Sequence, residues 1–531
     1  MKIHYYIYTA VVAMGMTLGL TSCNDYLDKQ PDSRLDLQSP DDVSKLLINA
    51  YPQVHPAYLL EMYSDNTDCN INTGWDAADR FQEQAYSWAD ITETGNYESP
   101  SVMWSTYYEA VTTANLALEH ISEVGETSQS LYAGQKGEAL LCRAYAMFQL
   151  ANVFCQAYDE QTADTDFGLP YPETASTNVH EKYDRGTLAQ LYAKIESDLV
   201  EGMKTIGENN FEKPKFHFGS ASAAAFAARF YLYYHKYDKA VEYANKALGS
   251  SPKTLLRDWA SWAELTVNGD VAPNAYINSS VKANLLLQVV ASEWGAIGGP
   301  YSYGDMYAHN AMVSEQETVQ SDGPWGNSGS VFNYGVFSNP SLSKYIVRKV
   351  PYDFEYSDIQ AGIGTPHAEY AEFTGDETLL VRAEAETMLG HYDAALQDLN
   401  LELSAFAKGD IQLTLDDVKK FYSDAVTAYY TPMKATPRKA LHTTFSIEQT
   451  TQEPLLQCIL HLRRILTVHE GLRMQDVKRY GITIYRRNVR SNYKVTDVTD
   501  TMEARDPRLA IQLPQDVIEA GLPANPRKQR E

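Results

Sequence analysis

A pair of alanine-bearing helical segments, present twice in the chain, constrains the fold more than any other feature. In the first copy, Ala-Ala-Arg at 227–229 precedes Tyr-Asp-Lys-Ala-Val at 237–241. In the second copy, Arg-Ala-Glu-Ala at 382–385 precedes Tyr-Asp-Ala-Ala-Leu at 392–396, and Gly390 supplies the turn. Small side chains at helical spacing let two antiparallel helices approach closely, and such pairs bury their apolar faces by stacking on neighbours. We therefore expect repeated helical hairpins.

Helical periodicity extends over much of the chain. The spacing of the second helix of a tetratricopeptide repeat is found at Ala240, Ala244, Ala247 and Pro252. Apolar residues at helical spacing predict repeat helices at about 101–250 and 374–402. Hydrophobic residues make up 44% and charged residues 21% of the chain, as in folded globular proteins. The prediction is a mainly α fold.

Two stretches interrupt this helical pattern. Residues 266–345 are rich in Gly, Asn, Ser and Pro, and they contain one expected buried strand at 285–290. Residues 403–440 are also less regular, and an Arg-rich helix is expected at about 455–480. Long ordered loops in a compact protein are usually functional. The predicted architecture is therefore a set of tetratricopeptide-like helical repeats packed against a loop-rich, irregular half.

The N-terminal segment has the order of a secretory signal. Lys2 precedes an apolar stretch that ends at Leu20, and small residues then lead to Cys23. The run Leu-Thr-Ser-Cys resembles a bacterial lipobox, in which the cysteine is acylated and anchors the protein to a membrane. We predict a signal peptide at 1–22, a lipidated tether (with palmitate on Cys23) at 23–40 and a single domain at 41–531. An ordinary cleaved signal with an incidental cysteine is the alternative.

Charge excludes some classes of partner. The net charge of −25, from 44 basic and 69 acidic residues, argues against a nucleic-acid binder and against basic-patch binding to anionic lipid. The basic stretch at 478–490 is expected to form a local basic surface or an intramolecular ion-pair face. The cysteines lack CxxC spacing, which argues against zinc, and Cys142 and Cys155 are expected to be buried thiols.

Signatures of catalysis are missing from the sequence. HExxH, Walker, GxSxG and post-strand GxGxxG motifs do not occur, and His469 is expected to be structural. Asp65 and Asp68 could in principle form a glycosidase pair or a calcium site, but a solvated loop is the expectation. We predict a non-enzymatic protein with no catalytic residues, no metal site and no cofactor.

Aromatic residues are abundant, with 38 Tyr and 7 Trp. A sugar ring stacks on an aromatic face while neighbouring polar groups fix its orientation. The candidate ligand-binding residues are the aromatics of the polar loops, for which the alternative is that each pins its loop to the body: Trp75, Trp325, Trp294, Tyr301, Tyr303 and Tyr307. Trp88 and Trp104 are expected in the core. Charged residues next to alanines in mid-helix are expected to form buried ion pairs, namely Arg143, Arg382, Glu384 and Arg473.

The order of several motifs resembles the SusD/RagB family of outer-membrane lipoproteins from Bacteroidetes. The similar segments are 22–28 (SCNDYLD), 138–145 (EALLCRAY), 374–385 (TGDETLLVRAEA), 470–481 (EGLRMQDVKRYG) and 506–515 (DPRLAIQLPQ). The resemblance spans nearly the whole chain. Ligand contacts in this family usually lie in regions such as 266–345 and 403–440, which follow no family motif here, so the ligand is not carried over.

The resemblance implies a function. It implies a lipid-anchored protein exposed at the cell surface on the outer membrane, which captures an oligo- or polysaccharide and delivers it to a SusC-like TonB-dependent transporter. It implies no catalysis. A RagB-like peptide binder on the same scaffold, an envelope assembly scaffold without ligand and a cryptic glycosidase are the alternatives.

Overall fold

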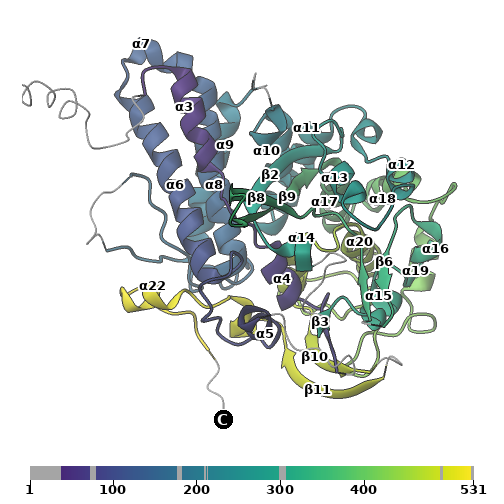
Figure 1. Cartoon of the computed structure of the whole chain (residues 1–531). Coiled ribbons are helices and arrows are strands. Elements are labelled where there is room, and N and C mark those ends of the chain that lie inside the picture. Colours follow the sequence, from purple (N-terminus) through teal and green to yellow (C-terminus); the bar gives the residue numbers. More distant parts are fainter. Residues whose placement is uncertain are drawn as a thin grey trace, which may run out of the picture.

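The computed structural model describes residues 37–71, 79–175, 182–207, 211, 213–297, 306–341, 343–490 and 494–527. The predicted signal peptide, Cys23 and most of the tether lie outside these ranges. Long helices form one side of the molecule, short helices and strands form the other, and a small sheet lies between them (Figure 1). The mainly α architecture with a loop-rich half is confirmed.

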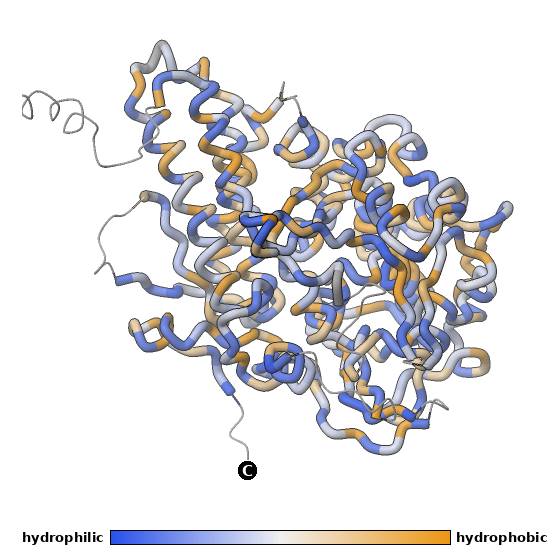
Figure 2. The backbone as a smooth tube through the Cα atoms, in the orientation of Figure 1, coloured by the Kyte–Doolittle hydropathy of each residue, from blue (hydrophilic) through white to orange (hydrophobic). Residues whose placement is uncertain are grey.

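The helical side begins with a capped helix. Ser39 is the N-cap of α3 (Pro40–Leu47), and its side chain accepts a hydrogen bond from the Asp42 amide, which satisfies a free N–H of the first turn. Helix α3 packs on α6 (Pro100–Glu123) and α8 (Ala133–Phe154). The C-terminal part of α8 is buried on all sides, so α8 is the central helix of this half. Apolar and polar stretches alternate along the other long helices (Figure 2).

The predicted helical hairpins are confirmed. The first copy forms α10 (Ser220–Tyr233) and α11 (Tyr237–Leu248), and the second forms α17 (Gly375–Met388) and α18 (Tyr392–Phe406). Helix α11 packs directly on α17, so the two hairpins stack although they are far apart in sequence. Gly390 has a φ of +80° at the second turn, a conformation that glycine adopts without steric cost.

Two small sheets position the loop-rich half. The predicted strand is confirmed as β2 (Asn284–Ala291), which pairs with β9 (Ile363–Thr374), and β9 pairs with β8 (Asp353–Asp358). The other sheet has the order β11-β10-β1-β3, with the strands Val495–Met502, Ile484–Val489, Asp68–Asn70 and Tyr307–Ala308. In this sheet β1 runs parallel to β10 and antiparallel to β3, which joins the N-terminal, middle and C-terminal parts of the chain.

The expected C-terminal helix is broken into two. Helix α20 (Gln452–Leu466) ends before a turn, and α21 (Arg473–Tyr480) follows. Gly471 in the turn has a φ of +78°, and a Cβ there would lie 2.6 Å from Ala57 Cα. The prediction of one helix over 455–480 is therefore wrong, because the close approach of the chain at Ala57 requires a left-handed residue without a side chain.

Short elements complete the fold. None of the helices in the described ranges is both long and apolar enough to cross a bilayer. The remaining helices are α4 (Ala57–Tyr63), α5 (Arg80–Tyr86), α7 (Glu126–Gln129), α9 (Leu188–Thr205), α12 (Trp259–Ala263), α13 (Val271–Tyr276), α14 (Trp294–Ile297), α15 (Ala311–Glu317), α16 (Ser328–Val331), α19 (Leu415–Phe421) and α22 (Gln515–Glu519). The remaining strands are β4 (Asp322–Gly323), β5 (Gly326–Asn327), β6 (Phe337–Asn339) and β7 (Lys344–Ile346).

Candidate functional site

Two of the aromatic residues predicted to contact ligand are buried. Trp325 and Trp294 are each 5% exposed, so the expectation that they present their rings to a ligand is wrong. Each indole N–H finds an internal acceptor: Trp325 donates to Ser328 Oγ at 3.0 Å, and Trp294 donates to the His469 carbonyl at 3.1 Å. A satisfied N–H removes the main cost of burying a tryptophan.

Of the other four candidates, Trp75, Tyr301 and Tyr303 lie outside the described residues. Tyr307 opens β3 and stacks on Tyr86, with ring centroids 4.2 Å apart. The Asn70 amide at the end of β1 donates to the Met306 carbonyl at 2.7 Å. The chain that leads to Trp75 and the chain that arrives from Tyr303 are therefore hydrogen-bonded to each other at this sheet edge.

The two irregular stretches of the sequence, 266–345 and 403–440, are in direct contact. The Asn333 amide donates to the Phe406 carbonyl at 2.8 Å, and the Lys408 amide donates to the Val331 carbonyl at 2.6 Å. Phe332 stacks on Phe406 at 4.3 Å between centroids. The regions without a family motif are thus joined into one body.

Between these stretches lies an open groove of about 720 Å³. Pockets that bind small ligands typically have volumes of about 300–1,000 Å³. One wall follows α15, β4 and β5 and consists of Glu315, Gln316, Gln320, Asp322, Asn327, Gly329 and Ser330. The other wall follows α19 and the chain after it and consists of Phe421, Val426, Thr427, Ala428, Lys434, Ala435, Thr436 and Pro437. We call this cavity the groove.

The groove combines uncharged polar side chains with apolar ones and with three charged side chains, Glu315, Asp322 and Lys434. Asn327 Nδ2 donates to the Gln320 carbonyl at 2.7 Å and to Asp322 Oδ1 at 3.1 Å, so the first wall is internally ordered. Within the described chain, the side chains of Gln316 and Lys434 make no hydrogen bond, and both are exposed. The Gln316 amide can therefore donate to and accept from a ligand, and its position next to apolar side chains suits a ligand rich in hydroxyl groups.

Trp325 supports this wall from beneath. Its ring lies so close to the β4–β5 turn that a Cβ on Gly323 would approach it to 2.3 Å. On the other side, the ring packs on His461 of α20 and on Phe332, at centroid distances of 5.1 and 5.3 Å. The sequence analysis expected the Trp325 ring to face a ligand, whereas in the structure the ring pins its loop to the body, which was the alternative.

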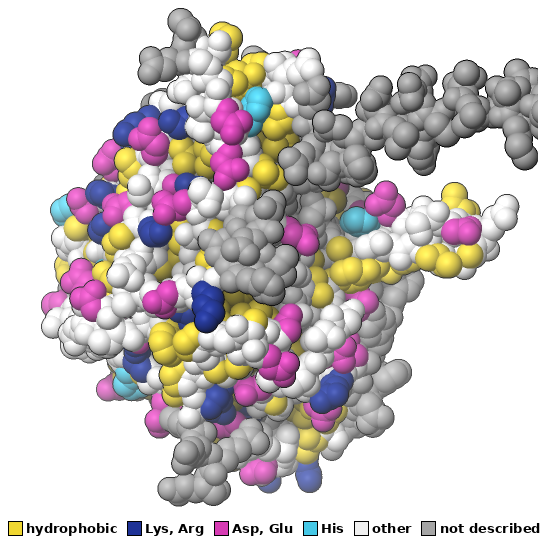
Figure 3. Space-filling model, turned by 90° about the vertical axis from the view of Figure 1, so that its left-hand side faces the viewer, with side chains coloured by type: hydrophobic (Ala, Val, Ile, Leu, Met, Phe, Trp, Pro, Cys, Tyr) yellow, Lys and Arg dark blue, Asp and Glu magenta, His cyan; other side chains and the backbone are white. Residues whose placement is uncertain are grey.

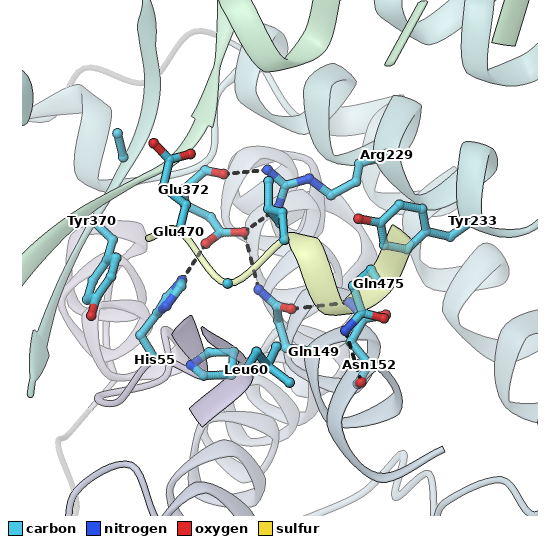
Figure 4. A pocket seen from close by; sticks show the side chains of 14 residues that line it. His55, Leu60, Gln149, Asn152, Arg229, Tyr233, Tyr370, Glu372, Glu470 and Gln475 are labelled. Atoms are coloured by element: carbon cyan, nitrogen blue, oxygen red, sulfur yellow. Dashed lines mark hydrogen bonds and ion pairs between the residues drawn. The ribbon is translucent and has the colours of Figure 1, made fainter. Parts of the chain in front are cut away.

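A second cavity lies deep between the two halves (Figure 4) and has a volume of about 30 Å³. This is room for a single water molecule, not for a sugar ring. The charges that converge on it are paired, since Glu372 accepts from Arg229 at 2.7 Å, from His55 at 2.8 Å and from Gln149 at 3.2 Å. Nearby Arg229 and the other donors hold the pKa of Glu372 below its usual value. The residues around this cavity therefore hold the two halves together and do not form a ligand site.

The acidic loop after α4 is also buried, so the prediction of a solvated loop at Asp65 and Asp68 is wrong. Asp65 Oδ1 accepts from Arg473 Nε at 2.7 Å and Asp65 Oδ2 from Arg473 Nη2 at 3.0 Å. We call the group formed by Asp65, Glu317, Lys439, Arg464 and Arg473 the Arg464 cluster. Arg464 and its neighbouring cations hold the pKa of Asp65 well below its usual range.

The ion pairs predicted in mid-helix are confirmed. Arg143 pairs with Asp198 at 2.6 Å and Arg382 with Asp398 at 2.6 Å, while Glu384 accepts from Arg479 at 2.7 Å. The basic stretch is an internal ion-pair face rather than a surface patch, because its members Lys478, Arg479, Arg486 and Arg487 are buried. The predicted buried thiols Cys142 and Cys155 are also confirmed, as is the core position of Trp88.

One buried carboxyl makes stability depend on pH. Glu98 accepts from Ser292 Oγ at 2.5 Å, and burial raises its pKa to about 7. The folded state therefore keeps this proton between about pH 4.5 and pH 7, where the unfolded chain has lost it, so stability from this group falls as pH rises through that window. Glutamine cannot ionise, so Glu98→Gln removes this dependence on pH. Between pH 5 and pH 8, the free energy of unfolding of the wild type should therefore fall by up to about 3 kcal/mol more than that of Glu98→Gln. Denaturant titrations at both pH values check this. Exposed Glu83→Gln is the control, and parallel pH profiles for wild type and Glu98→Gln would contradict the account.

Comparisons with known proteins agree on one family. A SusD-like family model, described as "Starch-binding associating with outer membrane", matches residues 25–232. The chain is 21% identical over 261 residues to SusD-like protein P38 of Formosa agariphila, a match that covers 48% of this chain and 47% of that one. The match thus spans about half of the relative's length.

Solved structures share the fold over almost the whole chain. A SusD superfamily protein from Bacteroides vulgatus has a TM-score of 0.62 at 17% identity, covering 93% of this chain and 100% of that one. A SusD-like carbohydrate binding protein from the same organism has a TM-score of 0.57 at 17% identity, with 85% of each chain covered. By these matches the chain is similar to the SusD/RagB family in sequence over its N-terminal part and in fold over most of its length. In this SusD-like chain, the groove lies outside the segment that the family model matches.

Proposed function

We propose that this SusD-like protein binds a glycan without catalysis and passes it to a transporter. The groove carries the proposal, because two regions that share no motif with the family meet there in a cavity of ligand size lined mainly by uncharged residues, both polar and apolar. The family description "Starch-binding associating with outer membrane" supports the same class of ligand.

Charge narrows the ligand class. The groove holds two carboxylates, Glu315 and Asp322, and one ammonium, Lys434. The chain as a whole carries a net charge of −25. A polyanionic glycan would be repelled at long range by this field. The proposed ligand is therefore a neutral oligo- or polysaccharide.

The edge at β1 and β3 is the proposed second contact. Tyr307 is partly exposed and stacked on Tyr86, and β1 and β3 are hydrogen-bonded there through the Asn70 amide and the Met306 carbonyl. Helix α15 leads directly from β3 to the groove and spans about 10 Å along its axis. A glycan chain longer than one or two sugars could contact both the edge and the groove.

The similarity to the SusD/RagB family also supports a proposal for the location and the partner. A lipid anchor at Cys23 would hold the protein on the outer membrane, facing outward, beside a SusC-like TonB-dependent transporter that takes up the bound glycan. The partner and the anchor are proposals that rest on the lipobox-like run and on the family description.

Isothermal titration calorimetry tests which class of ligand the protein binds. The chain is purified without its first 23 residues. It is titrated with neutral plant and host polysaccharides, with anionic polysaccharides and with a peptide digest. We expect saturable binding to a neutral glycan, and we expect Gln316→Ala/Gln320→Ala to weaken it about tenfold, since each lost polar contact contributes about 0.5–1.5 kcal/mol. Tyr307→Ala and Trp75→Ala report on the sheet edge.

The controls separate the alternatives. Tyr356→Ala removes an aromatic ring that is 55% exposed and does not line the groove, and it should leave the titration unchanged. Binding to peptides alone would favour a RagB-like peptide binder. Binding to neither class would favour an assembly scaffold, and release of reducing sugar during the titration would show a glycosidase.

A further inference from the structure

The strands β8 and β9 form a two-stranded arm at one edge of the central sheet. Strand β8 pairs with β9 from Asp353–His367 to Asp358–Ile363, whereas β2 pairs with β9 only from His367 to Thr374. Beyond His367, no strand of the described residues pairs with this ribbon as a third strand. We call residues 353–367 the arm. It stands out from the body at the right of Figure 3, with hydrophobic side chains along it.

One face of the arm continues the protein core outward. Strand β9 buries Ala368 and Tyr370 at its base, and the same face carries Pro366 opposite Phe354, and then Tyr356. Phe354 and Tyr356 pack edge to face at 4.8 Å. Tyr356 is 55% exposed, and Ile359 and Ile363 at the tip are 80% and 60% exposed. Apolar side chains gathered on an extension, rather than scattered singly, mark an interaction site.

The arm is held in shape by local contacts. Asp358 Oδ1 accepts from the amides of Gln360 and Ala361 at 2.9 and 3.0 Å, which closes the tip. Gly364 lies so close to β8 that a Cβ there would meet the Glu355 carbonyl oxygen at 2.1 Å. The exposed side chains are thus presented on an ordered ribbon, which reduces the entropy cost of docking.

The charges of the arm indicate the kind of occupant. Asp353, Glu355 and Asp358 are exposed on it, and the sequence has no Lys or Arg between Lys349 and Arg382. His367 pairs with Glu355 at 2.9 Å and offsets part of this charge. A second copy of the chain would place these carboxylates against each other, and an anionic membrane surface would repel them.

We propose that the arm docks into an apolar cleft, flanked by Lys and Arg side chains, on a protein partner. Tyr356 and Ile359 at the tip fill the cleft, while Asp353, Glu355 and Asp358 meet its basic rim. The proposal does not require a glycan in the groove, so it can be tested independently of the proposed ligand.

Photo-crosslinking of the full chain in the cells that produce it tests the arm. The photoreactive amino acid benzoylphenylalanine replaces Ile359 or, as a control, Leu116, an apolar residue that is 45% exposed on α6. We expect position 359 alone to give an adduct with one defined protein, in which the crosslinked peptide combines apolar residues with Lys or Arg. Asp353→Lys/Glu355→Lys, which leaves the Asp358 contacts at the tip in place, should lower the adduct yield about tenfold, because complementary charge speeds association by about this factor or more.

Three results would overturn the proposal: no adduct at position 359, an adduct to lipid or to a second copy, or an unchanged yield with the charge-reversed arm. The charge-reversed variant is checked by circular dichroism, so that loss of the adduct cannot be mistaken for loss of the fold. Its glycan titration should match that of the wild type, which separates a failed arm from a failed glycan site.

Discussion

Replacing Asp65 by Ala should lower the free energy of unfolding by about 3–5 kcal/mol, one of the two largest effects that we expect in this protein. Asp65 is buried and accepts two hydrogen bonds from Arg473, at 2.7 and 3.0 Å. It also lies 3.4 Å from Arg464 Nη2 and 3.5 Å from Lys439 Nζ. Without this carboxylate, three cations remain in the interior with Glu317 as their main counter-charge.

Denaturant unfolding at pH 7, followed by tryptophan fluorescence, measures this loss. The matched control is Glu242→Ala, which removes a 2.6 Å ion pair with Lys246 in which both side chains are about half exposed. Such surface pairs contribute about 0–1 kcal/mol. The cluster account fails if Asp65→Ala and Glu242→Ala destabilise the protein equally.

The dependence of stability on pH in acid is a second test of the Asp65 carboxylate. Its pKa is well below the ordinary value of 3.8, because the arginines around it favour the charged form. A lowered pKa contributes stability that is present above the unfolded pKa and is lost as pH falls towards the folded pKa. The difference between wild type and Asp65→Ala should therefore be constant above about pH 4 and shrink below it.

The parts of the fold that sequence could predict are those set by local pattern. Ala240 and Ala244 lie on one helix face, so their burial follows from periodicity alone. The strand at Asn284–Ala291 could likewise be predicted, from its short apolar run between stretches rich in turn residues. Arg143 could be assigned to an ion pair because a charge amid alanines in mid-helix must be neutralised when the helix is buried.

The errors have a common physical cause, which is that the decisive partner is distant in sequence. Asp65 follows a polar loop and reads as solvated, but its partners Arg464 and Arg473 come from the C-terminal helices. Trp325 lies between Pro324 and Gly326 and reads as a loop tip, but its ring packs on His461. Polar neighbours in the chain carry no information about such contacts.

The groove shows the same limit for the site. Both of its walls come from stretches without regular periodicity, and no local signal pairs Gln320 with Thr427 across the cavity. The sequence could indicate that each stretch is a long loop, and long loops carry function. Their contact through Asn333 and Phe406 could be found only in the folded molecule.

Replacing Trp325 by Ala should reduce both stability and glycan affinity. Removing a buried tryptophan costs about 3–5 kcal/mol through lost transfer energy and the cavity left behind. The ring also holds the β4–β5 turn against α20, and Asp322 and Asn327 of that turn line the groove. Once the support is gone, the wall no longer has one fixed geometry, so we expect the glycan affinity to fall at least about tenfold, as for sites whose side chains are not preorganised.

A second tryptophan in the same hydrophobic core separates the two effects. Trp262 is buried, donates to the Ala272 carbonyl at 2.8 Å and does not line the groove. Trp262→Ala should therefore destabilise the protein about as much as Trp325→Ala while leaving the glycan affinity of the folded fraction unchanged. Calorimetry at low temperature, where both variants are folded by circular dichroism, compares them. If the two substitutions weaken glycan binding equally, the loss comes from a softened core; if only Trp325→Ala weakens it, the ring beneath the β4–β5 turn shapes the wall that holds the sugar.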